Sequence, residues 1–167
     1  MLNFKNILVP TDFSENSTHA LEFAHYLAKQ SNSALHVLHI IEPINRSKPF
    51  NDNFTELRFE RSRFLEAEEE LRRFVNKISL QGVQIIEALD PGKPHEQILS
   101  YSRHHKIDLI VIASHGWTGL TNMTTGSVAN KILRTSEIPT ILVKSNALVM
   151  QKGIQNTKST FAENWVG

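Results

Sequence analysis

The feature that most constrains the fold of this chain is a regular alternation of short apolar runs with longer amphipathic stretches. Apolar runs rich in Val, Ile and Leu predict buried strands over 7–10, 34–41, 83–89, 108–113 and 140–143. Apolar residues at helical spacing predict helices over 15–30, over 55–80, from Pro94 past Tyr101, and over 126–136. The resulting β-α-β-α-β-α-β-α-β order predicts an α/β fold, in which a parallel sheet carries helices on both faces.

The second helix is the longest and the most highly charged. Its charged block over 66–73 is predicted to be a solvated face with local ion pairs. Gly82 is predicted to end this helix as a C′ glycine. An apolar stripe runs along the predicted helix, and it consists of Leu57, Phe64, Leu71, Phe74 and Ile78.

Length and composition predict one ordinary globular domain. The chain has 167 residues, of which 40% are hydrophobic, so it can bury a core without covalent staples. We expect a domain over 1–145 followed by a polar tail over 146–167 that contains Phe161 and Trp165. This tail is either disordered or a docking segment for a partner.

Charge and cysteine content disfavour several classes of protein. The net charge of +1 gives no basic excess for binding nucleic acid, so no nucleic-acid partner is expected. The absence of cysteine excludes disulfides, thiolate catalysis and Cys-based metal sites. No apolar run reaches the ~20 residues that cross a bilayer, and no signal peptide is recognised, so we expect a cytoplasmic protein without a membrane partner.

A glycine cluster follows the fourth predicted strand and leads into a helix. It contains Gly116, Gly119 and Gly126, and Ser127 comes next. Glycines let backbone N–H groups approach phosphate oxygens, and a helix N-terminus adds donors and a positive dipole end. The other interpretation is that these glycines serve ordinary turns. The fingerprints of P-loop NTPases and of dinucleotide dehydrogenases are both absent.

A carboxylate stands at the end of the first predicted strand. Asp12 follows Pro10 and Thr11, where it could bind ribose hydroxyls or help hold Mg²⁺ beside phosphates. The alternative is that Asp12 only caps the following helix, a role that Ser14 could also take. Ligands of parallel sheets bind beyond the carboxyl ends of the strands, where both Asp12 and the glycine cluster lie.

Histidines and one tryptophan offer further candidates. His36 and His39 are three apart on a strand and therefore face opposite sides, while the pair at 104–105 is expected to end a helix. A structural zinc site is therefore disfavoured. Trp117 in the glycine loop would either cover a ligand or anchor a partner.

Five segments together resemble the universal stress protein family. They are VPTDFS at 9–14, LHIIE at 38–42, ASHG at 113–116, GSVA at 126–129 and IPTILV at 138–143, and the resemblance covers residues 4–144. ATP-binding members of the family carry G-x-x-G, nine residues, and then G-[ST]. Gly116 and Gly126 keep that nine-residue spacing here, and Ser127 follows, but Ala113 replaces the first glycine.

The resemblance implies a Rossmann-like, adenine nucleotide alpha hydrolase-like fold with strand order 3-2-1-4-5. It implies an ATP-binding (or AMP- or ADP-binding) stress-response sensor or regulator, with Mg²⁺ at Asp12, that forms a homodimer through the fifth strand. His115 would touch phosphate or pack the turn. The implied nucleotide-binding residues are Pro10, Thr11, Asp12, Ile40 (through its backbone, to adenine), Ala113, His115, Gly116, Gly119, Gly126, Ser127, Val128 and Ala129.

Two other functions remain open at this point. One is a slow ATPase or adenine-nucleotide phosphohydrolase on the same scaffold, although no motif places a general base beyond Asp12 or His115. The other is a nucleotide-free interaction module that uses the loop at 42–54 and the tail.

Overall fold

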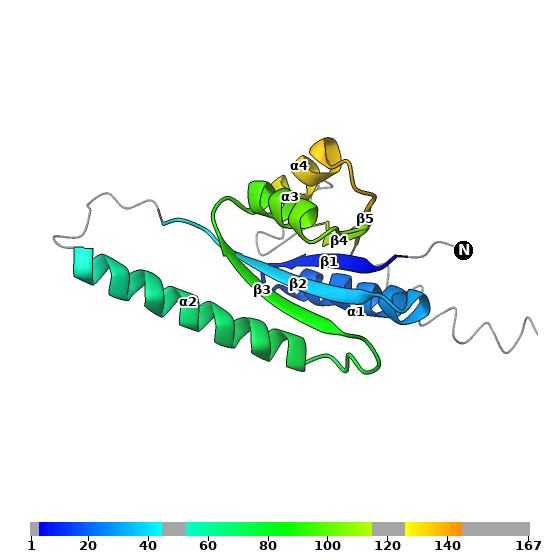
Figure 1. Cartoon of the computed structure of the whole chain (residues 1–167), viewed down its shortest axis with the longest axis horizontal. Coiled ribbons are helices and arrows are strands. Elements are labelled where there is room, and N and C mark those ends of the chain that lie inside the picture. Colours follow the sequence, from blue (N-terminus) through cyan, green and yellow to red (C-terminus); the bar gives the residue numbers. More distant parts are fainter. Residues whose placement is uncertain (1–3, 45–52, 115–125, 145–167) are drawn as a thin grey trace, which may run out of the picture.

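The structure is a computed structural model that describes residues 4–44, 53–114 and 126–144. In this part of the chain, strands and helices alternate along the sequence (Figure 1). They are β1 (Asn6–Thr11), α1 (Glu15–Ser31), β2 (Ala34–Ile41), α2 (Asn53–Asn76), β3 (Ile85–Pro91), α3 (Pro94–His104), β4 (Leu109–Ala113), α4 (Ser127–Thr135) and β5 (Thr140–Val143). The strands form one parallel sheet in the order β3-β2-β1-β4-β5, which confirms the expected fold.

The sheet separates two hydrophobic cores. On one face, α1 and α2 pack against a cluster that includes Ile7, Val9 and Leu71. On the other face, α3 and α4 cover a cluster that includes Leu8 and Ile110, as the two layers in Figure 1 show. Every residue of β4 is buried, so the prediction of a strand covered on both faces is confirmed.

The second helix differs from its prediction at both ends of its apolar stripe. Leu71 and Phe74 are buried, but Leu57 is 69% exposed and Phe64 is 44% exposed. The N-terminal end of α2 lies beyond the ends of the strands in Figure 1, so its apolar residues have no sheet to cover them. Ile78 packs against the core from outside the helix. The stripe was therefore predicted over too long a stretch.

Gly82 does not end α2, because the helix stops at Asn76. Gly82 lies instead in the turn before β3 and has a φ of +78°, a left-handed conformation that favours glycine. The strand after it covers Ile85–Pro91 rather than 83–89. The pattern of apolar residues marks each element here, but the turn chemistry between them misplaces the boundaries by several residues.

A buried polar pair lies between β2 and α3. Burial lowers the pKa of His36, and the nearby His105 lowers it further. Tyr101 donates its hydroxyl to Nδ1 of His36 at 2.9 Å, and Nε2 of His36 donates to Oδ1 of Asn6 at 3.4 Å. Burial, with a contribution from Asp90, raises the pKa of Tyr101 to about 12. Both residues are therefore held in their neutral forms.

This pair predicts a pH dependence of stability with two limits. Because the folded pKa of His36 lies below its ordinary 6.5, its contribution is complete above pH 6.5 and is lost as the pH falls below that value. Because the folded pKa of Tyr101 lies above 10, its contribution is complete below pH 10 and is lost between pH 10 and about 12. Urea unfolding of wild type and His36→Gln at pH 7.5 and 5.5 measures the acid limit.

We expect wild type to lose more stability than His36→Gln between the two pH values. His104→Gln, which replaces an exposed histidine of α3, is the matched control and should keep the wild-type loss. An equal loss in wild type and His36→Gln would contradict the assignment of the acid limit to His36.

The described residues contain neither a membrane-spanning helix nor a cluster of metal-binding side chains. No helix among them is long and apolar enough to cross a membrane. No group of three or more His, Asp or Glu side chains in the described ranges is placed to hold a metal ion. The predicted tail over 146–167, with Phe161 and Trp165, and most of the predicted loop at 42–54 lie outside the described residues.

Candidate nucleotide site

A cavity of about 340 Å³ opens at the carboxyl ends of the central strands. It lies where the chain crosses from β3 at one edge to β4 beside β1, the point at which strand order reverses. Small-molecule sites commonly have volumes of about 300–1,000 Å³, so the cavity falls in that range. Its walls come from the ends of β1, β2 and β4 and from the starts of α1, α3 and α4.

Asp12 forms part of the wall and also anchors α1. Its Oδ1 accepts hydrogen bonds from the N–H of Ser14 at 3.1 Å and from the hydroxyl of Ser17 at 2.5 Å. Ser14 is the N-cap residue, because its side chain accepts from the N–H of Ser17. The capping role therefore belongs to Ser14, and Asp12 both supports the first turn of α1 and lines the cavity.

The turn that carries Asp12 contains an unusual backbone conformation. Phe13 has a φ of +65°, which is rare for a bulky residue. Its ring stacks on His39 with 4.2 Å between ring centroids, and its N–H donates to Oγ1 of Thr11 at 3.0 Å. Packing of this kind is needed to hold such a conformation, which costs about 1–3 kcal/mol. The shape of this edge of the cavity therefore depends on contacts with β2.

The end of β2 is tied to both neighbouring strands. His39 donates Nδ1–H to the carbonyl of Thr11 at 2.9 Å, which joins β2 to β1. Gly92, after β3, donates its N–H to the carbonyl of Ile41 at 3.1 Å. Gly92 has a φ of +139°, a backbone conformation that favours glycine, and a Cβ there would lie 2.6 Å from the Gln97 side chain. Ile40 lies between these two ties and lines the cavity.

The start of α4 closes the opposite wall. Gly126 donates its N–H to the carbonyl of Ser114 at 2.7 Å, which joins the two described ends of the glycine loop. Gly126 is also the N-cap residue of α4, and no side chain caps this helix within the described residues. The first N–H groups of α4 therefore begin at Ser127, in the wall of the cavity, where they can serve an anion.

The structure brings together every described member of the predicted binding set around this cavity. These residues are Pro10, Thr11, Asp12, Ile40, Ala113, Gly126, Ser127, Val128 and Ala129. The other three, His115, Gly116 and Gly119, lie outside the described residues, as does Trp117.

Sequence analysis missed several residues of the wall. They are Ser17, Leu38, His39, Glu42, Pro94, Ile98 and Ile112. Glu42 and Pro94 had a usable signal, because each follows a predicted strand at its carboxyl end. Ser17 and Ile98 carried no such signal, since they lie inside helices.

The wall combines apolar and polar groups suited to an amphipathic ligand. Ile40, Ile98 and Ile112 offer apolar surface for a planar ring. Asp12 and Glu42 offer carboxylates for hydroxyl groups or a divalent cation, and the start of α4 offers donors for an anion.

The model of the universal stress protein family matches residues 3–144. The chain belongs to the universal stress protein family. This confirms the resemblance seen in the sequence motifs.

Curated relatives are similar in sequence, and solved structures share the fold. Universal stress protein YxiE of Bacillus subtilis is 29% identical over 153 residues, which cover 84% of this chain and 99% of the relative. The structure of MJ0577 from Methanocaldococcus jannaschii superimposes with a TM-score of 0.71 at 24% identity, over 86% of this chain and 97% of that one. A universal stress protein from Archaeoglobus fulgidus in complex with dAMP superimposes with a TM-score of 0.62 at 23% identity, over 86% of this chain and all (100%) of that one.

Proposed function

We propose that this universal stress protein binds ATP or a related adenine nucleotide in the cavity and acts as a nucleotide-dependent sensor or regulator. The observation that carries the proposal is the convergence of Asp12, Ile40 and the start of α4 on one cavity of about 340 Å³. The Archaeoglobus fulgidus relative in complex with dAMP supports the choice of an adenine nucleotide.

Each part of the proposed ligand has a matching part of the wall. The adenine ring would lie against the end of β2 at Ile40, and the ribose hydroxyls would lie near Asp12. The phosphates would face the N–H groups of α4 from Ser127 onward, where the helix dipole favours negative charge. Mg²⁺ would join the phosphates to the Asp12 carboxylate.

Isothermal titration of the purified chain with ATP, with and without Mg²⁺, tests the proposal. We expect saturable heat and a rise in Tm, because a ligand that binds only the folded state stabilises it. Removing Mg²⁺ with EDTA should weaken the binding of ATP more than that of AMP, because AMP has fewer phosphate charges for a cation to neutralise. The absence of both binding heat and a Tm shift at millimolar ATP would contradict the proposal.

We also propose that the protein forms a homodimer through β5. In the described sheet, β5 is an edge strand that pairs only with β4, and an exposed edge invites pairing with another strand. Light scattering should give twice the chain mass of 19.0 kDa. A mass of one chain at every concentration tested would count against the dimer.

A further inference from the structure

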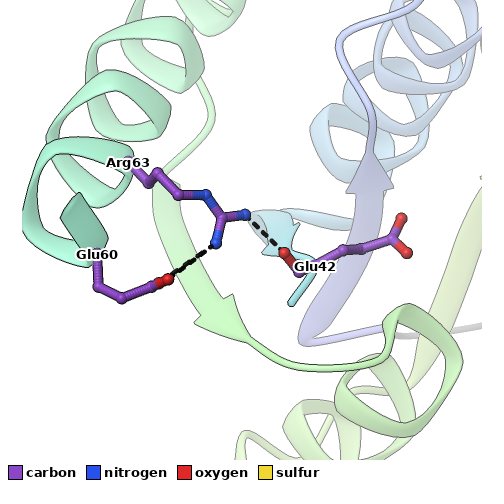
Figure 2. A network of polar contacts seen from close by, with 3 residues as sticks. All are labelled: Glu42, Glu60 and Arg63. Carbon is purple, nitrogen blue, oxygen red and sulfur yellow. Dashed lines mark hydrogen bonds and ion pairs between the residues drawn. The ribbon is translucent and has the colours of Figure 1, made fainter. Parts of the chain in front are cut away.

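Glu42, the first residue after β2, is held by a side chain from a different layer of the fold. Arg63 of α2 donates from Nη2 to the carbonyl oxygen of Glu42 at 2.6 Å, and its Nη1 lies 3.3 Å from Oε2 of Glu60. Figure 2 shows the guanidinium between these two partners, with the Glu42 carboxylate directed away from it. Arg63 therefore binds the backbone of Glu42 and does not contact the Glu42 carboxylate.

Arg63 is far better covered than a typical arginine of this helix. Its side chain is 18% exposed, whereas that of Arg72, which pairs with Glu68 on the same helix, is 61% exposed. Its guanidinium also lies 5.9 Å from the centre of the Phe59 ring. A partly desolvated guanidinium with a short, charge-assisted bond is oriented much more firmly than a solvated surface pair.

The strand end that Arg63 holds is shared by two hollows. His39, Ile40 and Glu42 line the candidate nucleotide cavity. The same three residues line a second hollow of about 450 Å³ against α2, which Arg63 also lines. Arg63 thus contacts, from the α2 side, the strand end that forms a wall of the nucleotide cavity.

The bond from Arg63 extends the hydrogen bonding at this strand end by one residue. His39 binds Thr11, and Ile41 receives the N–H of Gly92, but β2 ends at Ile41. The carbonyl of Glu42 lies one residue past that end, and the guanidinium of Arg63 is its partner.

We propose that Arg63 is a positioning residue for the adenine wall, which fixes the backbone from Ile40 to Glu42 and thereby sets the preference for adenine over other bases. The inference rests on the proposed nucleotide function. A wall held in its binding geometry before the ligand arrives costs less to order on binding, so a loose wall binds the base more weakly. Arg63 does not itself line the nucleotide cavity, so it would act through the backbone of Glu42.

Titration of Arg63→Met with AMP and with GMP tests the inference. We expect the Kd for AMP to rise about threefold to tenfold, because one charge-assisted hydrogen bond is lost and it affects binding only through the backbone. We also expect the ratio of the GMP Kd to the AMP Kd to fall. Arg72→Met is the matched control and should keep both Kd values within about twofold of wild type, because exposed ion pairs contribute little. Arg63→Lys should recover part of the AMP affinity.

Hydrogen exchange on the chain without nucleotide gives a second measurement that does not depend on binding. Arg63→Met should speed exchange of the backbone amides of Ile41, Glu42 and Ile44, and Arg72→Met should not. Binding and exchange together separate the proposed function from the role of Arg63. If the wild-type chain binds no adenine nucleotide, both the proposed function and the base preference are wrong, whatever the exchange rates are.

Two outcomes would overturn the inference while leaving the proposed function intact. One is wild-type affinity and an unchanged base preference in Arg63→Met. The other is an equal loss of affinity for AMP and GMP in both Arg63→Met and Arg63→Lys, which would assign Arg63 a general structural role.

Discussion

Ser127→Asp is expected to weaken ATP binding by about tenfold to a hundredfold while the fold stays intact. Ser127 is the first residue of α4, is exposed, and lines the cavity where the phosphates are proposed to lie. Two like charges about 4 Å apart near a protein surface repel by roughly 4 kcal/mol, and solvent exposure reduces this figure. The range above corresponds to about 1.4–2.8 kcal/mol.

The same substitution should not harm the helix. A carboxylate in the first turn interacts favourably with the helix dipole, by about 0.3–1 kcal/mol. No acidic residue stands in the first turn of α4, so nothing there opposes the new charge. Thermal unfolding without ligand should therefore show an unchanged or slightly raised Tm, which separates lost binding from lost structure.

Controls for this experiment isolate the charge. Ser127→Asn has nearly the size of the aspartate variant without its charge, and it should bind ATP much better than Ser127→Asp does. Adenosine, which lacks phosphates, should bind wild type and Ser127→Asp alike. Unchanged ATP affinity in Ser127→Asp would mean that the phosphates do not lie at the start of α4.

Leu71→Ala and Leu57→Ala are expected to differ widely although both change a leucine of the same helix. Leu71 is 2% exposed within the core on the α1 and α2 face of the sheet, and its truncation should cost about 2–5 kcal/mol of unfolding free energy. Leu57 is 69% exposed, so its truncation should cost less than about 0.5 kcal/mol. Urea unfolding followed by circular dichroism measures both.

Repeating both unfolding measurements at several protein concentrations shows whether the chain itself or a second copy covers Leu57. If Leu57→Ala costs as much as Leu71→Ala at every concentration, the N-terminal half of α2 is covered within the chain, contrary to the structure. A similar cost that appears only at high concentration would show that a second copy covers it.

The sheet was predictable because its signals are local. The boundaries of β2 and β5 match their predictions residue for residue, since each is a run rich in apolar residues that ends at a charged residue, Glu42 or Lys144. Part of the candidate site was predictable for a similar reason: Asp12 and the 126–129 segment stand beside elements whose type the sequence indicates. The family motifs added strand order, which local signals do not carry.

The error in the apolar stripe of α2 came from relations between distant residues. Leu57 and Leu71 have the same chemistry and lie on one predicted stripe, yet only Leu71 meets the sheet. Whether a helical residue is covered depends on how far the sheet extends beneath it, and no local pattern records that distance. The contact of Arg63 with the carbonyl of Glu42 joins residues 21 apart, and it likewise follows from how the helix packs.

The sequence by itself determined the α/β class, the order of the elements, and the residues that follow the ends of the strands. These features follow from periodicity, capping and turn chemistry, which act over a few residues. Only the tertiary structure decided which residues share the cavity and that α2 holds the end of β2. Those outcomes depend on packing between layers, where distance in space is independent of distance along the chain.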